Sequence, residues 1–334
     1  MLTTAQRSRP PQAHNRGGSD PGDPLRVVVL MGGVGTEREV SLRTGKAVVE
    51  ALRQGGHHAE PRVLESSDER ALDDLPRAAG VVFLALHGEW GEDGGVQRAL
   101  DARGWTYTGS GPEASELAFD KQRTKEALRR AGIPVAHDVV LPFPFGAREL
   151  RQALEAAPAG KVVVKPVRMG SSVGVRVCAD RAEVERALQE NAVYRQPQLI
   201  EEFVPGHELT VGILGDEALP LIEPVPSQGV YDYTAKYDPE AGTSYRVEPE
   251  AIPARVRAQA RRLALHTHVV LGCQQVSRVD LRWDPVRDRL VVLELNTLPG
   301  MTGTSLLPKA AAAAGISFPR LVERLCRQAL GVGA

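Results

Sequence analysis

Apolar residues in the first hundred positions gather in short runs that are separated by glycine-rich segments. Residues 26–31 (RVVVLM) have the length and the β-branched character of a buried parallel strand, and residues 81–86 are similar. The first run leads through the glycines of 32–35 into an amphipathic helix over about 37–54, and the second leads into a glycine- and acid-rich segment, 87–95. This repeat of strand, loop and helix predicts an open α/β sheet with its site at the carboxyl ends of the strands.

The pattern changes after about residue 120. A helix is expected over 120–132, and strands at 161–166 and 175–178 flank a glycine- and serine-rich segment, 167–174. A further helix and a further strand are expected at 181–191 and 198–203. Strands joined by a tight loop and followed by a helix indicate an α+β unit, unlike the first.

The last third of the chain predicts a second α+β unit that contains one long polar connection, residues 226–248. Loops of this length are uncommon in compact domains and are usually functional, so we expect this one to act as a lid. The elements around it are strands at 208–214, 218–223, 276–283 and 289–295, a helix at 254–271 and two C-terminal helices.

The chain has 334 residues, which is more than one hydrophobic core usually serves. We therefore expect an N-terminal α/β domain (25–119), a central domain (120–214) and a C-terminal domain (215–334) that carries the lid loop. Residues 1–24 are rich in Pro, Gly and Arg and are expected to form a disordered extension, because they hold too little apolar surface to offset the entropy of ordering.

Charge and cysteine content exclude several classes of protein. The net charge of −1 gives no indication of binding to nucleic acid or to an acidic membrane surface. No apolar run approaches the ~20 residues needed to cross a bilayer. The three cysteines are far apart in the sequence, which argues against a disulfide framework or a zinc site, and the N-terminus has no apolar signal core. These features predict a protein of the cytoplasm.

Three polar residues interrupt the two apolar strands near the end of the chain. Asp280 lies in one strand, and Glu294 and Asn296 lie two residues apart in the next, so all three can point to one face of the sheet. Carboxylate and carboxamide oxygens suit Mg²⁺ that is shared with substrate phosphates. The alternative, ordinary exposed strand residues, fits less well because Asp, Glu and Asn are poor strand formers.

A second set of residues suggests phosphate binding. Lys165 ends an apolar strand, where a charge is costly unless an anion pairs with it, and the backbone of 170–174 (GSSVG) can fold over phosphates. Alone, such a loop is more simply a plain hairpin, and it is not a P-loop, because GxxxxGK[ST] is absent. The connector from Glu201 to Val204, with Glu208 beyond it, could contact adenine and ribose, although this pattern by itself is weak.

In this order the motifs resemble those of D-alanine–D-alanine ligases of the ATP-grasp superfamily. The resemblance covers about residues 26–330 and includes GGVGTEREVSL (32–42), LHGEWGEDGGVQ (86–97), YTGSGPEASELAFDKQRTK (107–125), VVKPVRMGSSVGV (163–175), EEFVPGHELTVGILG (201–215), YDYTAKY (231–237), RVDL (278–281) and ELNTLPGMTGTSLLP (294–308). Departures at Gly35, Met169 and Ser277 remove no catalytic group.

The resemblance implies an ATP-grasp fold, of class α/β and α+β, that sandwiches ATP. It also implies a two-step reaction for peptidoglycan precursor synthesis: one D-alanine carboxylate takes the γ-phosphate of ATP, and the amine of a second D-alanine displaces phosphate. Two Mg²⁺ ions, with Mn²⁺ as a possible substitute, would be bound by Asp280, Glu294 and Asn296. The residues implied to contact ATP are Lys121, Lys165, Ser171, Glu201, Glu202, Val204, Glu208 and Lys236.

The resemblance also implies roles toward the amino acids. Glu37 would bind the first ammonium and form a catalytic group with Ser171 and Tyr237, while Arg278 and the Gly300 N–H would stabilise the oxyanion. The substrate contacts would come from Glu37, Val40, Ser41, His87, Ser305 and Leu306. Homodimers are typical of the family.

Two alternatives remain at this stage. One is an ATP-grasp enzyme with another substrate, but the segments EREVSL and YDYTAKY favour dipeptide synthesis. The other is a nucleotide-binding protein without activity, against which the retained Arg278 and metal ligands argue.

Overall fold

The protein is described by a computed structural model that covers residues 23–227, 242–303 and 305–332. Most of the expected N-terminal extension (1–24) and part of the expected lid, with Lys236 and Tyr237, lie outside these residues. Three sheets make up the described fold, and none of its described helices is long and apolar enough to span a membrane.

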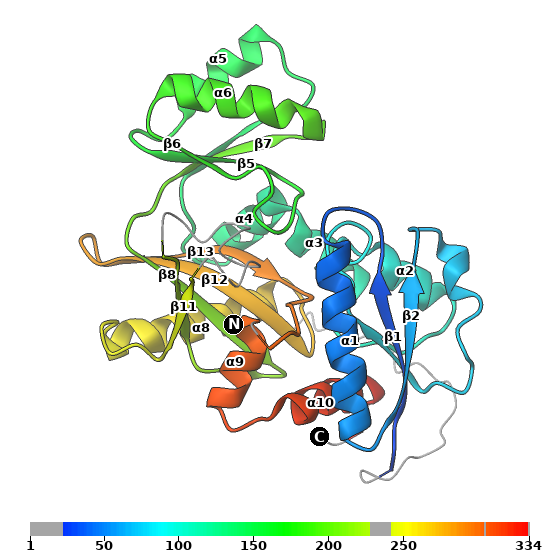
Figure 1. Ribbon diagram of the computed structural model, residues 1–334. Helices are drawn as coiled ribbons and strands as arrows, with labels where there is room; N and C mark the ends of the chain where they lie inside the picture. Colours follow the sequence, from blue (N-terminus) through cyan, green and yellow to red (C-terminus); the bar gives the residue numbers. More distant parts are fainter. Residues whose placement is uncertain (1–22, 228–241, 304, 333–334) are drawn as a thin grey trace, which may run out of the picture.

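The N-terminal sheet has the parallel order β2-β1-β3, formed by β1 (Arg26–Gly32), β2 (His58–Leu64) and β3 (Val81–Leu84). In β1 every residue after the first is buried, as expected for a central parallel strand. Helix α1 (Arg38–Gln54) lies against this sheet (Figure 1). The approach is close at Gly45, where a β-carbon would lie 2.5 Å from that of Met31. The remaining elements are η1 (Glu69–Leu72) and α2 (Gly95–Ala102).

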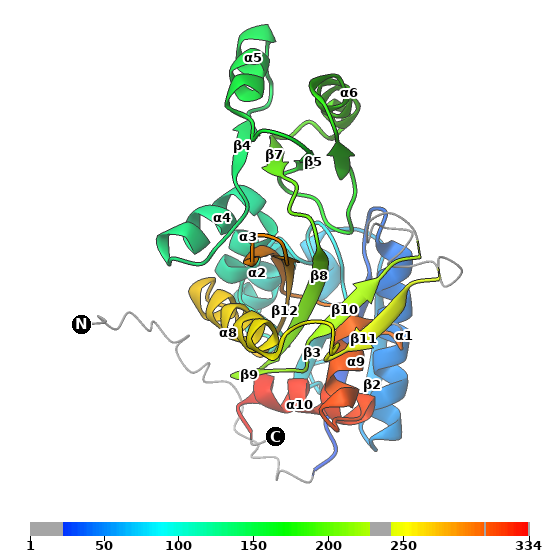
Figure 2. The same ribbon diagram turned by 90° about the vertical axis from the view of Figure 1, so that its left-hand side faces the viewer.

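The central sheet is antiparallel with the order β4-β7-β5-β6, and it rises above the rest of the molecule in Figures 1 and 2. Helices α5 (Ala147–Ala156) and α6 (Arg181–Asn191) lie on its outer side, and a small core of Val, Leu and Ile side chains joins them to it. The strands are β4 (Asp138–Leu141), β5 (Val162–Pro166), β6 (Arg176–Cys178) and β7 (Gln198–Glu202); η2 (Ala192–Tyr194) follows α6.

The C-terminal sheet is also antiparallel, with the order β11-β10-β8-β12-β13 and with β9 paired to β8. Helix α8 (Ala254–Val270) packs on it together with α3 (Pro112–Phe119) and α4 (Lys121–Arg130), and α9 (Leu306–Ala313) and α10 (Phe318–Leu330) connect it to the N-terminal sheet. The strands are β8 (His207–Leu214), β9 (Glu217–Ala218), β10 (Ile222–Val225), β11 (Ser244–Val247), β12 (Val276–Asp284) and β13 (Arg289–Asn296).

The C-terminal sheet differs from the sequence-based expectation in three places. The strand expected over 218–223 is divided into β9 and β10, because Pro220 cannot donate to a ladder. The connection expected over 226–248 contains β11, which pairs with β10. Strand β8, which we grouped with the central segment, hydrogen-bonds along its whole length to β12, so the change of sheet falls between β7 and β8.

Candidate active site

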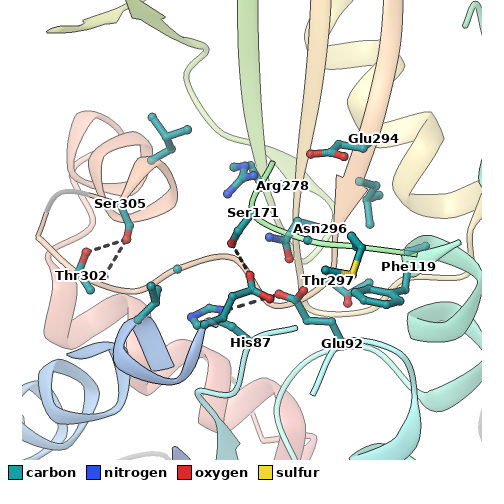
Figure 3. A pocket seen from close by; sticks show the side chains of 18 of the residues that line it. His87, Glu92, Phe119, Ser171, Arg278, Glu294, Asn296, Thr297, Thr302 and Ser305 are labelled. Atoms are coloured by element: carbon teal, nitrogen blue, oxygen red, sulfur yellow. Dashed lines mark hydrogen bonds and ion pairs between the residues drawn. The ribbon is translucent and has the colours of Figure 1, made fainter. Parts of the chain in front are cut away.

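Two cavities adjoin where the three sheets meet, and Lys121, Met169 and Glu294 line both of them. The first has a volume of about 340 Å³ and is shown in Figure 3. The second, of about 180 Å³, lies between the central and C-terminal sheets. A group bound in one cavity can therefore react with a molecule bound in the other.

Glu37 is the central acidic residue of the first cavity. It caps α1 directly after the loop that follows β1, and its carboxylate accepts a hydrogen bond from the Ser171 hydroxyl. Ser171 adopts a left-handed conformation, with φ of 50°, in the loop between β5 and β6. Gly88 and Gly170 leave room for the carboxylate, because a β-carbon at Gly88 would collide with it and one at Gly170 would lie 3.1 Å from Oε1.

Electrostatics make the Glu37 carboxyl group easier to protonate than an exposed one. Burial raises its pKa, and the nearby Glu92 carboxylate raises it further. The hydrogen bond from Ser171 and the charges of His87 and Lys121 oppose this increase. The ionised form of such a carboxylate is stabilised when a cation, such as the ammonium of an amino acid, enters the cavity.

His87 connects Glu37's helix to the acid-rich loop. Its Nε2 lies 3.2 Å from Thr44 Oγ1, and its Nδ1 lies 3.4 Å from Glu92 Oε1. Figure 3 shows His87 and Glu92 close to Ser171. Glu92, which we did not single out from the sequence, is therefore part of the cavity wall, and the acid-rich loop after β3 was the available signal for it.

The two neighbouring residues that we expected to contact substrate, Val40 and Ser41, differ in where they lie. Val40 lines the first cavity, but Ser41 does not. The Ser41 side chain is fully buried, accepts a hydrogen bond from the Gly32 N–H at 2.8 Å and donates one to the Ala85 carbonyl at 2.7 Å. These bonds tie α1 to β1 and to the segment after β3, so Ser41 positions the helix that carries Glu37.

Arg278 and Asp280 form a two-pronged ion pair on β12. Arg278 Nε and a terminal nitrogen donate to the two Asp280 oxygens at 2.9 and 2.8 Å, and Thr210 Oγ1 donates to Asp280 Oδ1 at 2.6 Å. Across the strand pair, Asp280 is opposite Glu294, and Arg278 is opposite Asn296. The guanidinium faces the first cavity, while Asp280 borders the second.

The donor set at this strand pair suits a hard divalent cation. Asp280 and Glu294 supply carboxylate oxygens, and Asn296 supplies a carboxamide oxygen that already accepts a bond from the Leu298 N–H at 2.9 Å. Lys121 Nζ lies 3.7 Å from Glu294 Oε2 and donates to the Met169 carbonyl at 2.6 Å. In the described part of the chain, His, Cys, Asp and Glu alone form no group of three that could hold a metal.

The second cavity combines buried charge with an apolar wall. Lys165 Nζ lies 2.5 Å from Glu201 Oε2, and this pairing raises the pKa of Lys165 although burial opposes it. Glu208 pairs with Arg282, which also donates to the Val204 carbonyl at 3.0 Å. Arg289 holds the side chain of Glu202 by bonds of 2.6 and 2.8 Å, which leaves Glu202 to contact a ligand through its backbone.

The loop before α9 completes the first cavity. Gly300, Ser305 and Leu306 all line it. Ser305 precedes α9, and its hydroxyl oxygen accepts a bond from the Thr302 N–H at 3.0 Å (Figure 3). A β-carbon at Gly300 would lie 2.9 Å from that hydroxyl oxygen. Helix N-termini favour anions such as carboxylates.

Apart from Ser41, all of the expected site residues that the structure describes lie on the wall of one cavity or the other. Residues that the sequence did not single out also line the cavities: Arg43, Glu92, Phe119, Thr297, Phe203 and Arg282.

Comparisons with known protein sequences point to one family. A family profile described as "D-ala D-ala ligase C-terminus" matches residues 128–327. The D-alanine–D-alanine ligase of Gluconobacter oxydans is 44% identical over 313 residues, which cover 92% of this chain and 99% of the relative. The ligase of Acidiphilium cryptum is 44% identical over 301 residues, covering 89% and 95%.

Solved structures of the same family also resemble this chain. The crystal structure of a D-alanine–D-alanine ligase from Bacillus anthracis complexed with ATP superposes with a TM-score of 0.78 at 30% identity, covering 92% of this chain and 98% of that one. Such ligases have the ATP-grasp fold, so the three sheets described above are an ATP-grasp arrangement. By sequence, fold and cavity geometry together, this chain belongs to the D-alanine–D-alanine ligase family.

Proposed function

We propose that the first cavity binds two molecules of D-alanine and the second binds ATP, and that the chain joins the amino acids into D-alanyl-D-alanine for peptidoglycan precursors. The single observation that carries this proposal is the meeting of the two cavities at Lys121 and Glu294. A phosphoryl group at that meeting point is within reach of a carboxylate in the first cavity.

In the first step, a carboxylate oxygen of one D-alanine attacks the γ-phosphorus, and the bond from that phosphorus to the β-phosphate bridging oxygen breaks to release ADP. Glu37 would hold the ammonium of this D-alanine, because a carboxylate partly deprived of water pairs strongly with a cation. Lys121 and Lys165 would hold the phosphates from the two sides of the second cavity.

In the second step, the free amine of the other D-alanine attacks the acyl carbon and the C–N bond forms. The C–O bond to phosphate then breaks, and the proton that the nitrogen loses leaves with the phosphate. Arg278 and the Gly300 N–H, which border the first cavity, would stabilise the tetrahedral oxyanion. The start of α9 at Ser305 and Leu306 would receive the carboxylate of this second D-alanine.

Asp280, Glu294 and Asn296 would hold Mg²⁺, for which Mn²⁺ could substitute. When bound, the ions supply positive charge that offsets the charge on the phosphate oxygens. By family resemblance, we further propose two ions per site, a homodimer and a cytoplasmic location, where ATP is available. Sedimentation velocity would test the dimer.

The activity is tested by phosphate release from ATP with Mg²⁺ and D-alanine, with the dipeptide identified by mass spectrometry. L-alanine is the control, because it has the same charges and the opposite handedness. We expect rapid release with D-alanine and release near the ATP-only background with L-alanine. Equal rates with both amino acids, or no dipeptide, would refute the proposal.

A further inference from the structure

A buried lysine lies behind the second cavity and does not line it. Lys125 is on α4, and its side chain is 1% exposed. Its Nζ donates to Glu201 Oε1 at 2.5 Å and lies 2.8 Å from Asp138 Oδ1. Charges of this kind are rarely buried without partners, because their desolvation costs several kcal/mol. Lys125 therefore needs both of these carboxylates to remain charged in this position.

The contacts of Lys125 continue into the nucleotide site through Glu201. One Glu201 oxygen binds Lys125, and the other lies 2.5 Å from Lys165 Nζ. The side chains of Glu201 and Asp138 are 2% and 5% exposed, so water can replace little of this bonding. At the outer end, Asp138 also pairs with Arg129. The result is one continuous row of alternating charges from α4 to the cavity.

A free lysine side chain samples many rotamers, and holding one in place costs entropy. Glu201 restricts Lys165 to the position in which its ammonium borders the cavity. Glu201 can do this only if its other oxygen is engaged, since a carboxylate with one unbound oxygen would turn to share both with Lys165. Lys125 supplies the bond that prevents this rotation.

We propose that Lys125 is a positioning residue for nucleotide binding, which fixes Glu201 so that Glu201 in turn holds Lys165 toward the phosphates. This inference rests on the proposed binding of ATP in the second cavity. Lys125 itself touches neither the nucleotide nor the amino acids, so its effect must pass through Glu201.

The direct test replaces Lys125 with Met, which has similar length and no charge, in the full chain. The dissociation constant of Mg²⁺–ADP is measured by calorimetry without D-alanine, and KM for D-alanine is measured separately. We expect the constant for ADP to rise ten-fold or more, roughly the loss of one charged hydrogen bond, and KM for D-alanine to stay within two-fold. Arg130→Met on the same helix is the matched control, because this side chain is 79% exposed and pairs with Glu126 at the surface.

A merely structural role would lower the melting temperature or the active fraction and leave the constant for ADP unchanged. That result in a folded Lys125→Met protein would overturn the proposal. If this variant does not fold, Asp138→Asn provides the test, since it keeps the volume and removes the charge that anchors Lys125 and pairs with Arg129. We expect a rise of a few-fold in the ADP constant for Asp138→Asn, and an unchanged value would likewise overturn the proposal. Lys125→Arg, which keeps the charge, should bind ADP more tightly than Lys125→Met.

The dependence of ADP affinity on pH provides a second test of the role of Lys125. Burial lowers the pKa of Lys125 to about 8, against the opposing effect of Glu201. Wild-type affinity for ADP should therefore weaken as the pH rises above about 8, whereas Lys125→Met should lack this change. Because ADP binding needs no D-alanine, the two proposals fail differently. A protein that ligates D-alanine but whose Lys125→Met variant binds ADP normally would refute the positioning role alone, and one that binds no ADP would refute both.

Discussion

Replacing Glu37 with Gln removes one negative charge from the first cavity and leaves the shape of the cavity nearly unchanged. Glutamine keeps the size of the side chain and an oxygen that can accept the Ser171 hydroxyl bond, so the contact between α1 and the β5–β6 loop should survive. Only the negative charge opposite the substrate ammonium is removed. The variant therefore measures how much that charge contributes to binding of the first D-alanine.

A hydrogen bond to a charged group contributes about 1.5–3 kcal/mol, which corresponds to roughly a 10- to 150-fold rise in KM for D-alanine. The dissociation constant for ADP should stay within two-fold, because Glu37 does not line the second cavity. Glu39→Gln, an exposed carboxylate in the first turn of the same helix, is the matched control and should leave both constants unchanged.

We expect Glu37→Gln to lower activity without lowering the stability of the ligand-free protein. The pKa of Glu37 is raised by burial and by Glu92, so the folded protein binds this proton more tightly than the unfolded chain. The contribution of Glu37 to stability is therefore present at low pH and is lost as the pH rises through its raised pKa. At neutral pH the ionised group destabilises the ligand-free fold, and Glu37→Gln should melt at the same temperature or higher.

The assay is initial-rate phosphate release over a range of D-alanine concentrations, at several pH values from neutral downward, together with thermal melting. Wild-type KM should rise as Glu37 becomes protonated, while Glu37→Gln should show no such change. An unchanged KM at neutral pH would mean that Glu37 does not bind the ammonium. A variant that melts several degrees lower would mean that the Glu37 charge stabilises the fold, against the reasoning above.

Three further changes test other parts of the structure. Glu294→Gln should weaken Mg²⁺ binding by roughly 10- to 100-fold, with turnover partly recovered at high Mg²⁺; normal turnover at low Mg²⁺ would contradict the metal assignment. Arg278→Lys loses the fork that binds Asp280 and should lower kcat by roughly 100-fold, measured at saturating substrates; a kcat near wild type would remove the oxyanion role. Burial lowers the pKa of His268 to about 4, so the wild type should lose up to about 3 kcal/mol of unfolding free energy between pH 6.5 and 4, and His268→Gln should show a smaller slope by urea denaturation; equal slopes would contradict this.

The apolar patterns predicted most of the inner strands, but they missed three of the strands at sheet edges. Strand β1 is buried along its whole length after the first residue, and its sequence is a nearly continuous apolar run. The strands that we did not predict, β2, β4 and β11, all lie at the edge of a sheet. Edge strands face water on one side, and their mixed sequences resemble loops.

For the candidate site, the sequence indicated residue types but not the contacts between them. Glu37 and Ser171 are 134 residues apart, and Lys125 and Glu201 are 76 apart, so only the fold brings each pair together. Motif resemblance pointed to residues on the cavity walls. It included Lys125, the last residue of the 107–125 segment, but gave it no role, because this side chain lies behind a cavity wall and does not line it. Ser41 also belongs to a motif, but its side chain bonds to the backbone of Gly32 and Ala85 and does not line either cavity.

Only the first of the two cavities takes part of its described wall from the N-terminal portion of the chain, and this has a consequence for evolution. Side chains from residues 37–92 contribute to the first cavity and none of them reaches the second, whose described lining comes entirely from residues 121–294. If the first cavity binds the amino acids and the second binds ATP, as proposed, substitutions in the N-terminal portion alter which amino acid is accepted without changing the wall of the nucleotide cavity. A lineage could acquire a new substrate preference in this way while it keeps the same means of activation by ATP.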